Sequence, residues 1–191
     1  MIEIKFNNNN NENNKKNKKT KKYIDQEDNR IDHQPGYQST PTTGEFDQFC
    51  IEALEEHNKY RNMHHVPPLT LNKECCDIAK TYAERLAKDD MLEHSDNMYK
   101  GDNLGENLYM CGGYKATGKE MTKSWYNEVR KHNFNGDYQG GTGHFTQLVW
   151  KNTKEVGFGW ATNGRGSYYC VGNYYPAGNF MGMFQANVFP A

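Results

Sequence analysis

The chain has 191 residues, 35% of them hydrophobic, and its formal net charge is −1. This length suits one domain with an appendage, and the nearly neutral charge gives no strong attraction to nucleic acid, so no nucleic-acid partner is expected. No stretch approaches the roughly 18 apolar residues of a membrane span. No apolar leader follows Met1, so we expect an intracellular protein, cytoplasmic or peripheral on membranes. Ile2 stands where N-myristoylation requires glycine, so we do not expect that anchor for this form of the chain.

Residues 1–41 are expected to form a disordered arm. Between residues 7 and 22 the sequence is almost entirely Asn and Lys, with Glu12 as the acidic exception. Such a segment has no apolar periodicity with which to offset the entropy of ordering. A solvated low-complexity arm is the simpler interpretation. The alternative is a polybasic tether for anionic membranes or nucleic acid, because each Lys near an anionic surface contributes about 1 kcal/mol.

Two helices are predicted in the first half of the chain. A capping-box pattern, Thr42-x-x-Glu45, precedes apolar residues at helical spacing from Phe46, so a first helix should run to about Met63. Asn72 can cap a second helix. The buried face of that second helix should carry Cys76, Ala79, Tyr82, Ala83 and Leu86.

The remaining elements are a loop, a third helix and a pair of strands. We expect a loop that contains His94 and ends at residues 105–107, followed by a helix over residues 119–131. The inward face of this helix should carry Met121, Trp125 and Val129. Apolar residues then alternate over 156–160 and aromatic residues gather over 168–175, with the hairpin signal Asn163-Gly164 between them. Helices followed by strands favour an α+β layered domain.

The five cysteines do not suit a closed disulfide framework. Their number is odd, and Cys75 and Cys76 are adjacent. Reduced thiols in an intracellular protein are therefore the simpler expectation. No Cys-x-x-Cys pair occurs, which argues against a structural zinc site built from cysteines.

Five motifs follow one another in order along residues 46–191. They are HNxxR at 57–61, PPLxLN at 67–72, HS with GENL at 94–95 and 105–108, GHFTQLVW at 143–150, and NYYPAGN at 173–179. Together they resemble the CAP superfamily, which includes the plant pathogenesis-related type 1 proteins and the venom allergen-like proteins. The resemblance implies that residues 42–191 form one α+β domain, a three-layer α-β-α sandwich with a central cleft.

One departure from the secreted members bears on the branch of the family. Gly172 stands where those members carry a cysteine directly before the second signature, and residues 141–144 and 149–154 resemble the intracellular, Golgi-associated branch. The resemblance implies association with lipid membranes and self-association, with a homodimer as its simplest form. Membrane contact would have to come from the Lys-rich arm or from the folded surface.

The resemblance also places four polar residues in the cleft: His94, Glu106, Glu128 and His144. Neutral imidazoles are good zinc ligands, so His94 and His144 are the expected ligands of a divalent metal ion, most simply zinc. A glutamate beside each histidine could orient the ring or act as a base. The alternative interpretation is a polar cluster satisfied by its own hydrogen bonds. The signature residues expected to support the site are His57, Arg61, Asn107, Asn173 and Tyr174.

Other candidate residues give weaker signals. His132 lies four residues after Glu128 and is a spare ligand candidate. His64 and His65 precede a Pro-Pro turn and are expected to face solvent. Neither Gly-x-Ser-x-Gly nor His-Glu-x-x-His occurs. Ser95 directly follows His94, which is poor geometry for a nucleophile and its base.

The leading functional hypothesis is a non-enzymatic binding protein. It would hold a divalent metal ion in the His/Glu cleft and bind a lipid, a sterol or an anionic membrane surface, as the resemblance implies. One alternative is a metal-dependent hydrolase or protease that uses the same cleft. The other is a protein-interaction module in which the cleft has lost its role.

Overall fold

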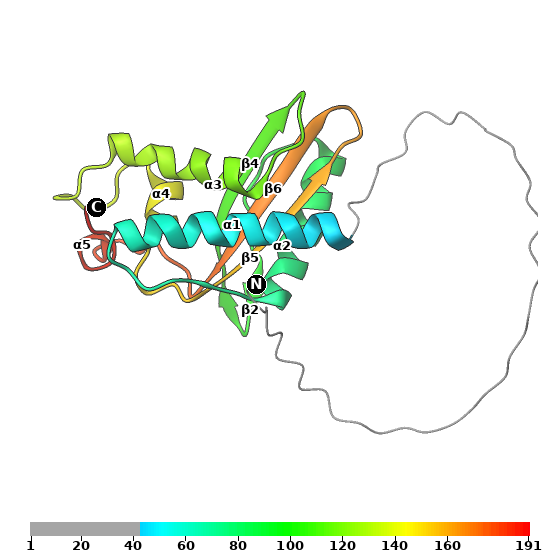
Figure 1. Cartoon of the computed structure of the whole chain (residues 1–191). Coiled ribbons are helices and arrows are strands. Elements are labelled where there is room, and N and C mark those ends of the chain that lie inside the picture. Colours follow the sequence, from blue (N-terminus) through cyan, green and yellow to red (C-terminus); the bar gives the residue numbers. More distant parts are fainter. Residues whose placement is uncertain (1–42) are drawn as a thin grey trace, which may run out of the picture. The chain divides into compact units, whose positions relative to one another are not determined.

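The computed structural model describes residues 43–191, so the expected arm lies outside the described residues. Four strands form one sheet in the order β1-β5-β6-β4, with helices on both faces (Figure 1). Helices α1 and α3 pack on one face and α2 packs on the other. The expectation of a three-layer α+β sandwich is therefore confirmed. In chain order the elements are α1 Thr43–Met63, β1 Thr70–Leu71, α2 Lys73–Asp89, β2 Met98–Tyr99, β3 Asp102–Asn103, β4 Gly105–Gly112, α3 Gly118–Tyr126, η1 Asn127–Lys131, α4 Gly143–Leu148, β5 Glu155–Thr162, β6 Ser167–Tyr175 and α5 Phe184–Asn187.

The sheet is buried on both faces, because successive residues of its strands point to opposite helical layers. On β6, Cys170 and Tyr174 belong to the core shared with α1 and α3, whereas Tyr169 and Val171 belong to the core shared with α2. Two glycines of β5 allow α2 to approach closely. A Cβ atom at Gly157 would lie 2.2 Å from the main chain of α2, which no real structure tolerates.

Strands β5 and β6 form the predicted hairpin. They pair antiparallel from Glu155 with Tyr175 to Thr162 with Tyr168. The side chain of Asn163 organises the connecting turn, since its oxygen accepts hydrogen bonds from the main-chain N–H groups of Arg165 and Ser167. The Asn-Gly signal in the sequence therefore located this turn correctly.

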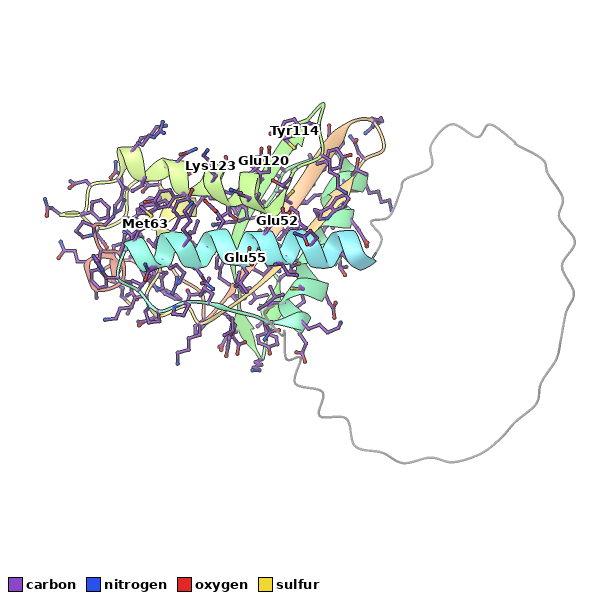
Figure 2. All side chains as sticks on the ribbon, in the orientation of Figure 1. Glu52, Glu55, Met63, Tyr114, Glu120 and Lys123 are labelled. Carbon is purple, nitrogen blue, oxygen red and sulfur yellow. The ribbon has the colours of Figure 1, made fainter. Side chains whose placement is uncertain are left out.

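Helix α2 begins where the sequence predicted. The Asn72 side chain accepts a 3.0 Å hydrogen bond from the N–H of Cys75, which satisfies one of the free donors at the start of the helix. The five residues predicted for its buried face are all buried. The outer layer is polar by contrast. Figure 2 shows Glu52 and Glu55 on α1 and Glu120 and Lys123 on α3 among its side chains.

Two elements differ from the sequence expectations. The expected loop after His94 ends in strand β4, which was not predicted from the sequence. This strand pairs with β6 along its whole length. The expected third helix changes at Asn127 from an α-helix to a 3₁₀-helix. Both changes matter for the site, because β4 carries Glu106 and the 3₁₀-helix carries Glu128.

His64 is buried, so the expectation that it faces solvent is wrong. Its Nδ1 donates to the main-chain oxygen of Phe189 at 2.6 Å, and its Nε2 accepts from the hydroxyl of Tyr126 at 3.0 Å. The C-terminal segment packs over the end of α1 and covers this ring, whereas His65 remains exposed. Within residues 43–191, no helix combines the length and the apolar composition that crossing a membrane requires.

Candidate functional site

His94 and Glu106 form the first of two histidine–glutamate pairs. The Nδ1 of His94 donates a 2.8 Å hydrogen bond to one carboxylate oxygen of Glu106. The same carboxylate accepts from the main-chain N–H of Ser95 at 2.9 Å and from its hydroxyl at 2.6 Å. Glu106 is nearly buried, while the His94 ring is 64% exposed. The two donors of Ser95 thus fix the carboxylate, and the imidazole ring that the carboxylate orients faces solvent.

His144 and Glu128 form the second pair in the same way. The Nδ1 of His144 donates to Glu128 at 2.7 Å, and the other carboxylate oxygen accepts from the main-chain N–H groups of His144 at 2.9 Å and Phe145 at 3.1 Å. The ring of His144 lies nearly parallel to that of Trp125, with 6.2 Å between the centroids. The ring is therefore held both by its hydrogen bond and by its packing.

Strand β4 connects the two pairs. Glu106 lies on the face that α2 covers, as does Leu108, while Asn107 points to the face of α1 and α3. The amide of Asn107 donates to the main-chain oxygen of His144 at 3.0 Å. One pair is therefore anchored on each side of this edge strand.

The hydrogen bond within each pair shifts the pKa of one of its two residues. The hydrogen bond to Glu106 raises the pKa of His94 above 6.5, because the carboxylate stabilises the charged ring. Burial by itself would raise the pKa of Glu128, but the hydrogen bond and charge of His144 and the two main-chain donors outweigh it and lower that pKa. In each pair the partner therefore favours the charged form of one group, which is the His94 ring in the first pair and the Glu128 carboxylate in the second.

Each pair leaves one imidazole nitrogen available. Because Nδ1 carries the proton donated to the glutamate, Nε2 of the neutral ring presents a lone pair. No hydrogen bond among the described residues uses the Nε2 atom of His94 or His144. Zinc-binding histidines commonly have this arrangement, in which the second nitrogen donates to a carboxylate.

The donor set fits at most a two-histidine metal site. In the part of the chain that the structure describes, no three side chains of His, Cys, Asp or Glu are gathered closely enough to hold one metal ion. Two nitrogen ligands would leave the remaining coordination positions to water, as in an exchangeable site. His132, the spare candidate, donates to the hydroxyl of Thr142, and none of the hydrogen bonds among the described residues joins it to Glu128.

The supporting residues expected from the signatures form a buried chain of hydrogen bonds. Asn107 donates to the hydroxyl of Tyr174 at 3.1 Å, and that hydroxyl donates to Nε2 of His57 at 2.8 Å. Nδ1 of His57 donates to the main-chain oxygen of Ala53 at 2.7 Å. Desolvation of this fully buried ring lowers the pKa of His57 to about 3. His57 is therefore a neutral structural residue that connects α1 to the sheet.

Arg61 and Asn173 are also fully buried. The guanidinium of Arg61 donates to the main-chain oxygens of four residues, at distances from 2.7 to 3.2 Å, namely Pro67, Leu148, Trp150 and Thr153. Arg61 thus fastens α1 to the segment that follows His144. Asn173 pairs in register with Glu106, and its side-chain amide makes no hydrogen bond with any described residue.

The role of Ser95 was not predicted from the sequence. Its hydroxyl donates to the carboxylate of Glu106 and not to an imidazole, so it orients the glutamate and is not prepared as a nucleophile. The adjacency of His94 and Ser95 was the available signal, because a short loop can bring both donors to one carboxylate. Trp125, predicted as core, also supports His144.

The fold and this arrangement define a member of the CAP family. The model of the family described as the cysteine-rich secretory protein family matches residues 54–174. The chain belongs to this family.

Among its relatives is Golgi-associated plant pathogenesis-related protein 1 of Homo sapiens. It is 45% identical over 146 residues, which are 75% of this chain and 94% of that protein. Pathogenesis-related protein 1C of Nicotiana tabacum is 36% identical over 69% of this chain and 77% of its own length. Protein PRY2 of Saccharomyces cerevisiae is 36% identical, but the match spans only 41% of that longer protein.

Solved structures have the same fold. The crystal structure of NaASP2 with Zn²⁺ superposes with a TM-score of 0.59 at 24% identity, over 74% of this chain and 86% of that one. Venom allergen-like protein 4 of Schistosoma mansoni superposes with a TM-score of 0.55 at 25% identity, over 68% of this chain and 88% of that one. These structures confirm the expected fold.

Proposed function

We propose that this CAP domain is a binding protein that holds a zinc-like divalent metal ion between His94 and His144. The observation that carries the proposal is that a fixed glutamate accepts from Nδ1 of each ring, which leaves Nε2 available as a ligand. Glu106 and Glu128 orient the rings and compensate the charge of the metal. NaASP2, which has the same fold, has a crystal structure with Zn²⁺, and this supports the choice of zinc as probe.

A site with two protein ligands is weaker than a structural zinc site with four. We expect the protein to remain folded without metal, because the buried core of the sandwich does not depend on this site. When bound, the ion would supply Lewis acidity and a polarised water molecule. The residues of this chain would position that ion.

Calorimetric titration of zinc into the full chain tests the proposal. The His94→Ala/His144→Ala double variant should lose most of the affinity. Glu106→Gln and Glu128→Gln should each weaken binding by about 10–100-fold, the usual effect of changing a residue that orients a ligand. The matched control is His65→Asn, which changes an exposed histidine and keeps a residue that tolerates its left-handed backbone, φ 58°.

Two outcomes would contradict the metal site. Undiminished binding by the double variant would move the ion elsewhere, with His132 as the next candidate. Equal loss in the His65→Asn control would assign the heat of binding to surface histidines in general.

We propose further that the protein binds a lipid surface through its C-terminal loop. The loop carries the apolar side chains of Phe180, Met181 and Met183 within four residues, with Gly182 between the two methionines. These three residues are 53%, 70% and 43% exposed. A hollow of about 400 Å³ adjoins this loop and includes Lys154 among its lining residues. Exposed apolar side chains beside a hollow lined in part by a lysine suit an anionic bilayer, because the Phe180 ring and the thioethers can enter the acyl region while the ammonium contacts phosphate.

Sedimentation with phosphatidylserine-containing vesicles tests the lipid contact. Met181→Asp should reduce binding, whereas the control Met110→Asp, at an exposed methionine on β4, should not. Deletion of residues 1–41 measures the contribution of the Lys-rich arm, which should decline with added salt as the charges are screened. If Met181→Asp and the deletion both bind as the intact chain does, neither surface belongs to a membrane contact.

A further inference from the structure

Two cysteine thiols meet beside Phe158, on the open edge of β5. Strand β1 pairs only with Glu155 and Val156, so from Gly157 onward β5 has no strand partner on that side. The Sγ of Cys50, in α1, donates to the main-chain oxygen of Phe158 at 3.3 Å. Cys76, in α2, belongs to the same buried cluster as Cys50, whereas the buried residues that follow it on α2 belong to the cluster on the other side of the sheet.

The contact joins two layers that the sheet otherwise separates. Cys50 lies on α1, which covers one face of the sheet, and Cys76 lies on α2, which covers the other (Figure 1), yet both residues belong to one buried cluster. Both residues are buried, with exposures of 2% and 4%. Neither takes part in the histidine–glutamate site, so the pair has no role in the function proposed above.

The other cysteines are less suited to form a bond with each other. Cys111 and Cys170 lie on neighbouring strands, but Cys170 pairs in register with Tyr109, so the two cysteines are diagonal neighbours. Diagonal side chains on a sheet are about 7–8 Å apart, whereas a disulfide needs about 3.5–4.5 Å between its Cβ atoms. The side chain of Cys75 lies against Gly157, and burial raises its pKa to about 12.

The environment of Cys76 favours its reactive form. The Cys50 S–H can turn from the oxygen of Phe158 to a Cys76 thiolate, and this hydrogen bond, together with one from the Phe158 main chain, lowers the pKa of Cys76 against the opposing effect of burial. A thiolate is the nucleophile in thiol oxidation, and the thiol that contacts it is placed to complete the bond.

We propose that Cys50 and Cys76 are an oxidative modification site at which hydrogen peroxide forms an intrachain disulfide between α1 and α2. The Cys76 thiolate attacks the O–O bond and becomes a sulfenic acid, and the departing hydroxide takes up the thiol proton to leave as water. The Cys50 sulfur then displaces the sulfenic oxygen, which leaves as a second water when the S–S bond forms. Two thiols are oxidised and one peroxide is reduced to two water molecules.

The burial of the pair sets the rate of this reaction. Peroxide must reach the sulfurs through a local opening of the edge where α1, α2 and β5 meet, so oxidation should be slower than that of an exposed thiol. Once formed, the bond closes a chain loop between residues 50 and 76 and restricts the unfolded state. The midpoint of thermal unfolding should therefore rise by roughly 5 °C or more.

Peptide mapping of the full chain tests the proposal. The protein is incubated with hydrogen peroxide, alkylated in denaturant and digested without reductant. We expect the loss of two hydrogen atoms in the intact mass, a linked peptide pair containing Cys50 and Cys76, and its reversal by dithiothreitol. Cys50→Ser and Cys76→Ser should each abolish the link. The matched controls Cys75→Ser and Cys111→Ser should retain it.

The outcomes separate clearly. A link through Cys75, Cys111 or Cys170, or full alkylation of Cys50 and Cys76 after oxidation, would overturn the proposal, as would oxidation of single cysteines without a cross-link. Circular dichroism of each variant verifies its folding. If a serine variant does not fold, the mapping of the unaltered chain and its shift in thermal midpoint still decide the result.

Discussion

The side-chain amide of Asn107 donates a hydrogen bond of 3.0 Å to the main-chain oxygen of His144. The preceding residue, Glu106, holds His94 from the opposite face of the same strand. Two adjacent residues of β4 therefore fix both histidines. Because side chains alternate along a strand, a shift of one residue in the pairing of β4 would exchange these two contacts and dismantle the arrangement.

Replacement of Asn107 should weaken both the fold and the site. Asn107→Ala leaves the oxygen of His144 and the hydroxyl of Tyr174 without a donor, so the free energy of unfolding should fall by about 1–3 kcal/mol. Urea denaturation measures this change. The control Asn103→Ala, at an exposed position in β3, should change it by less than about 0.5 kcal/mol. Equal midpoints for the two variants would show that the Asn107 bonds contribute nothing.

The pKa of His94 should depend on Glu106. The hydrogen bond to the carboxylate raises this pKa above 6.5, so the pair stabilises the fold fully below pH 6.5, and this contribution is lost as the pH rises through the raised value. Proton NMR titration of the His94 ring should give a pKa above 6.5 that decreases in Glu106→Gln. An unchanged titration in that variant would mean that the hydrogen bond does not persist in solution.

Arg61 should be among the residues most important for stability. Arg61→Met would deprive four main-chain oxygens of a buried donor, and we expect the free energy of unfolding to fall by about 3 kcal/mol or more. Arg85→Met is the matched control, since the Arg85 side chain is 69% exposed and its ion pair with Asp89 is long, at 3.6 Å. That change should cost about 0.5 kcal/mol or less. A small effect of Arg61→Met in urea denaturation would contradict the structural role.

Local signals in the sequence were sufficient for the elements that local chemistry determines. Asn72 caps α2 and Asn163 shapes the hairpin turn because each side chain bonds to main-chain groups within four residues. Strand β4 was not predicted because Glu106 and Asn107 interrupt its apolar pattern. These polar residues belong to the site, and their partners come from other parts of the chain.

The site itself could not be derived from spacing. Glu106 lies 12 residues from His94, and Glu128 lies 16 residues from His144, on different elements in each pair. Family resemblance selected these four positions, and the structure adds which glutamate holds which histidine. The burial of His64 had no local signal, because the segment that covers it lies 125 residues further along the chain.

Acid should destabilise the protein through His57. The unfolded chain binds a proton at His57 with a pKa of about 6.5, whereas burial lowers the folded-state pKa to about 3. A charged His57 would also need a second acceptor, because the Tyr174 hydroxyl already donates to its Nε2. Between these two values only the unfolded state takes up the proton, so the free energy of unfolding should decrease by roughly 1 kcal/mol per pH unit as the pH falls.

The variant His57→Phe isolates this contribution. It should be less stable at neutral pH, because it loses the hydrogen bonds to Ala53 and Tyr174, but its stability should depend less steeply on pH between 6 and 4. Urea denaturation at a series of pH values gives both quantities. His94→Ala should keep the steep dependence, since the raised pKa of His94 acts with the opposite sign. A slope in His57→Phe as steep as that of the unaltered chain would mean that the acid sensitivity arises at other residues, of which His64, with its lowered pKa, is the first to examine.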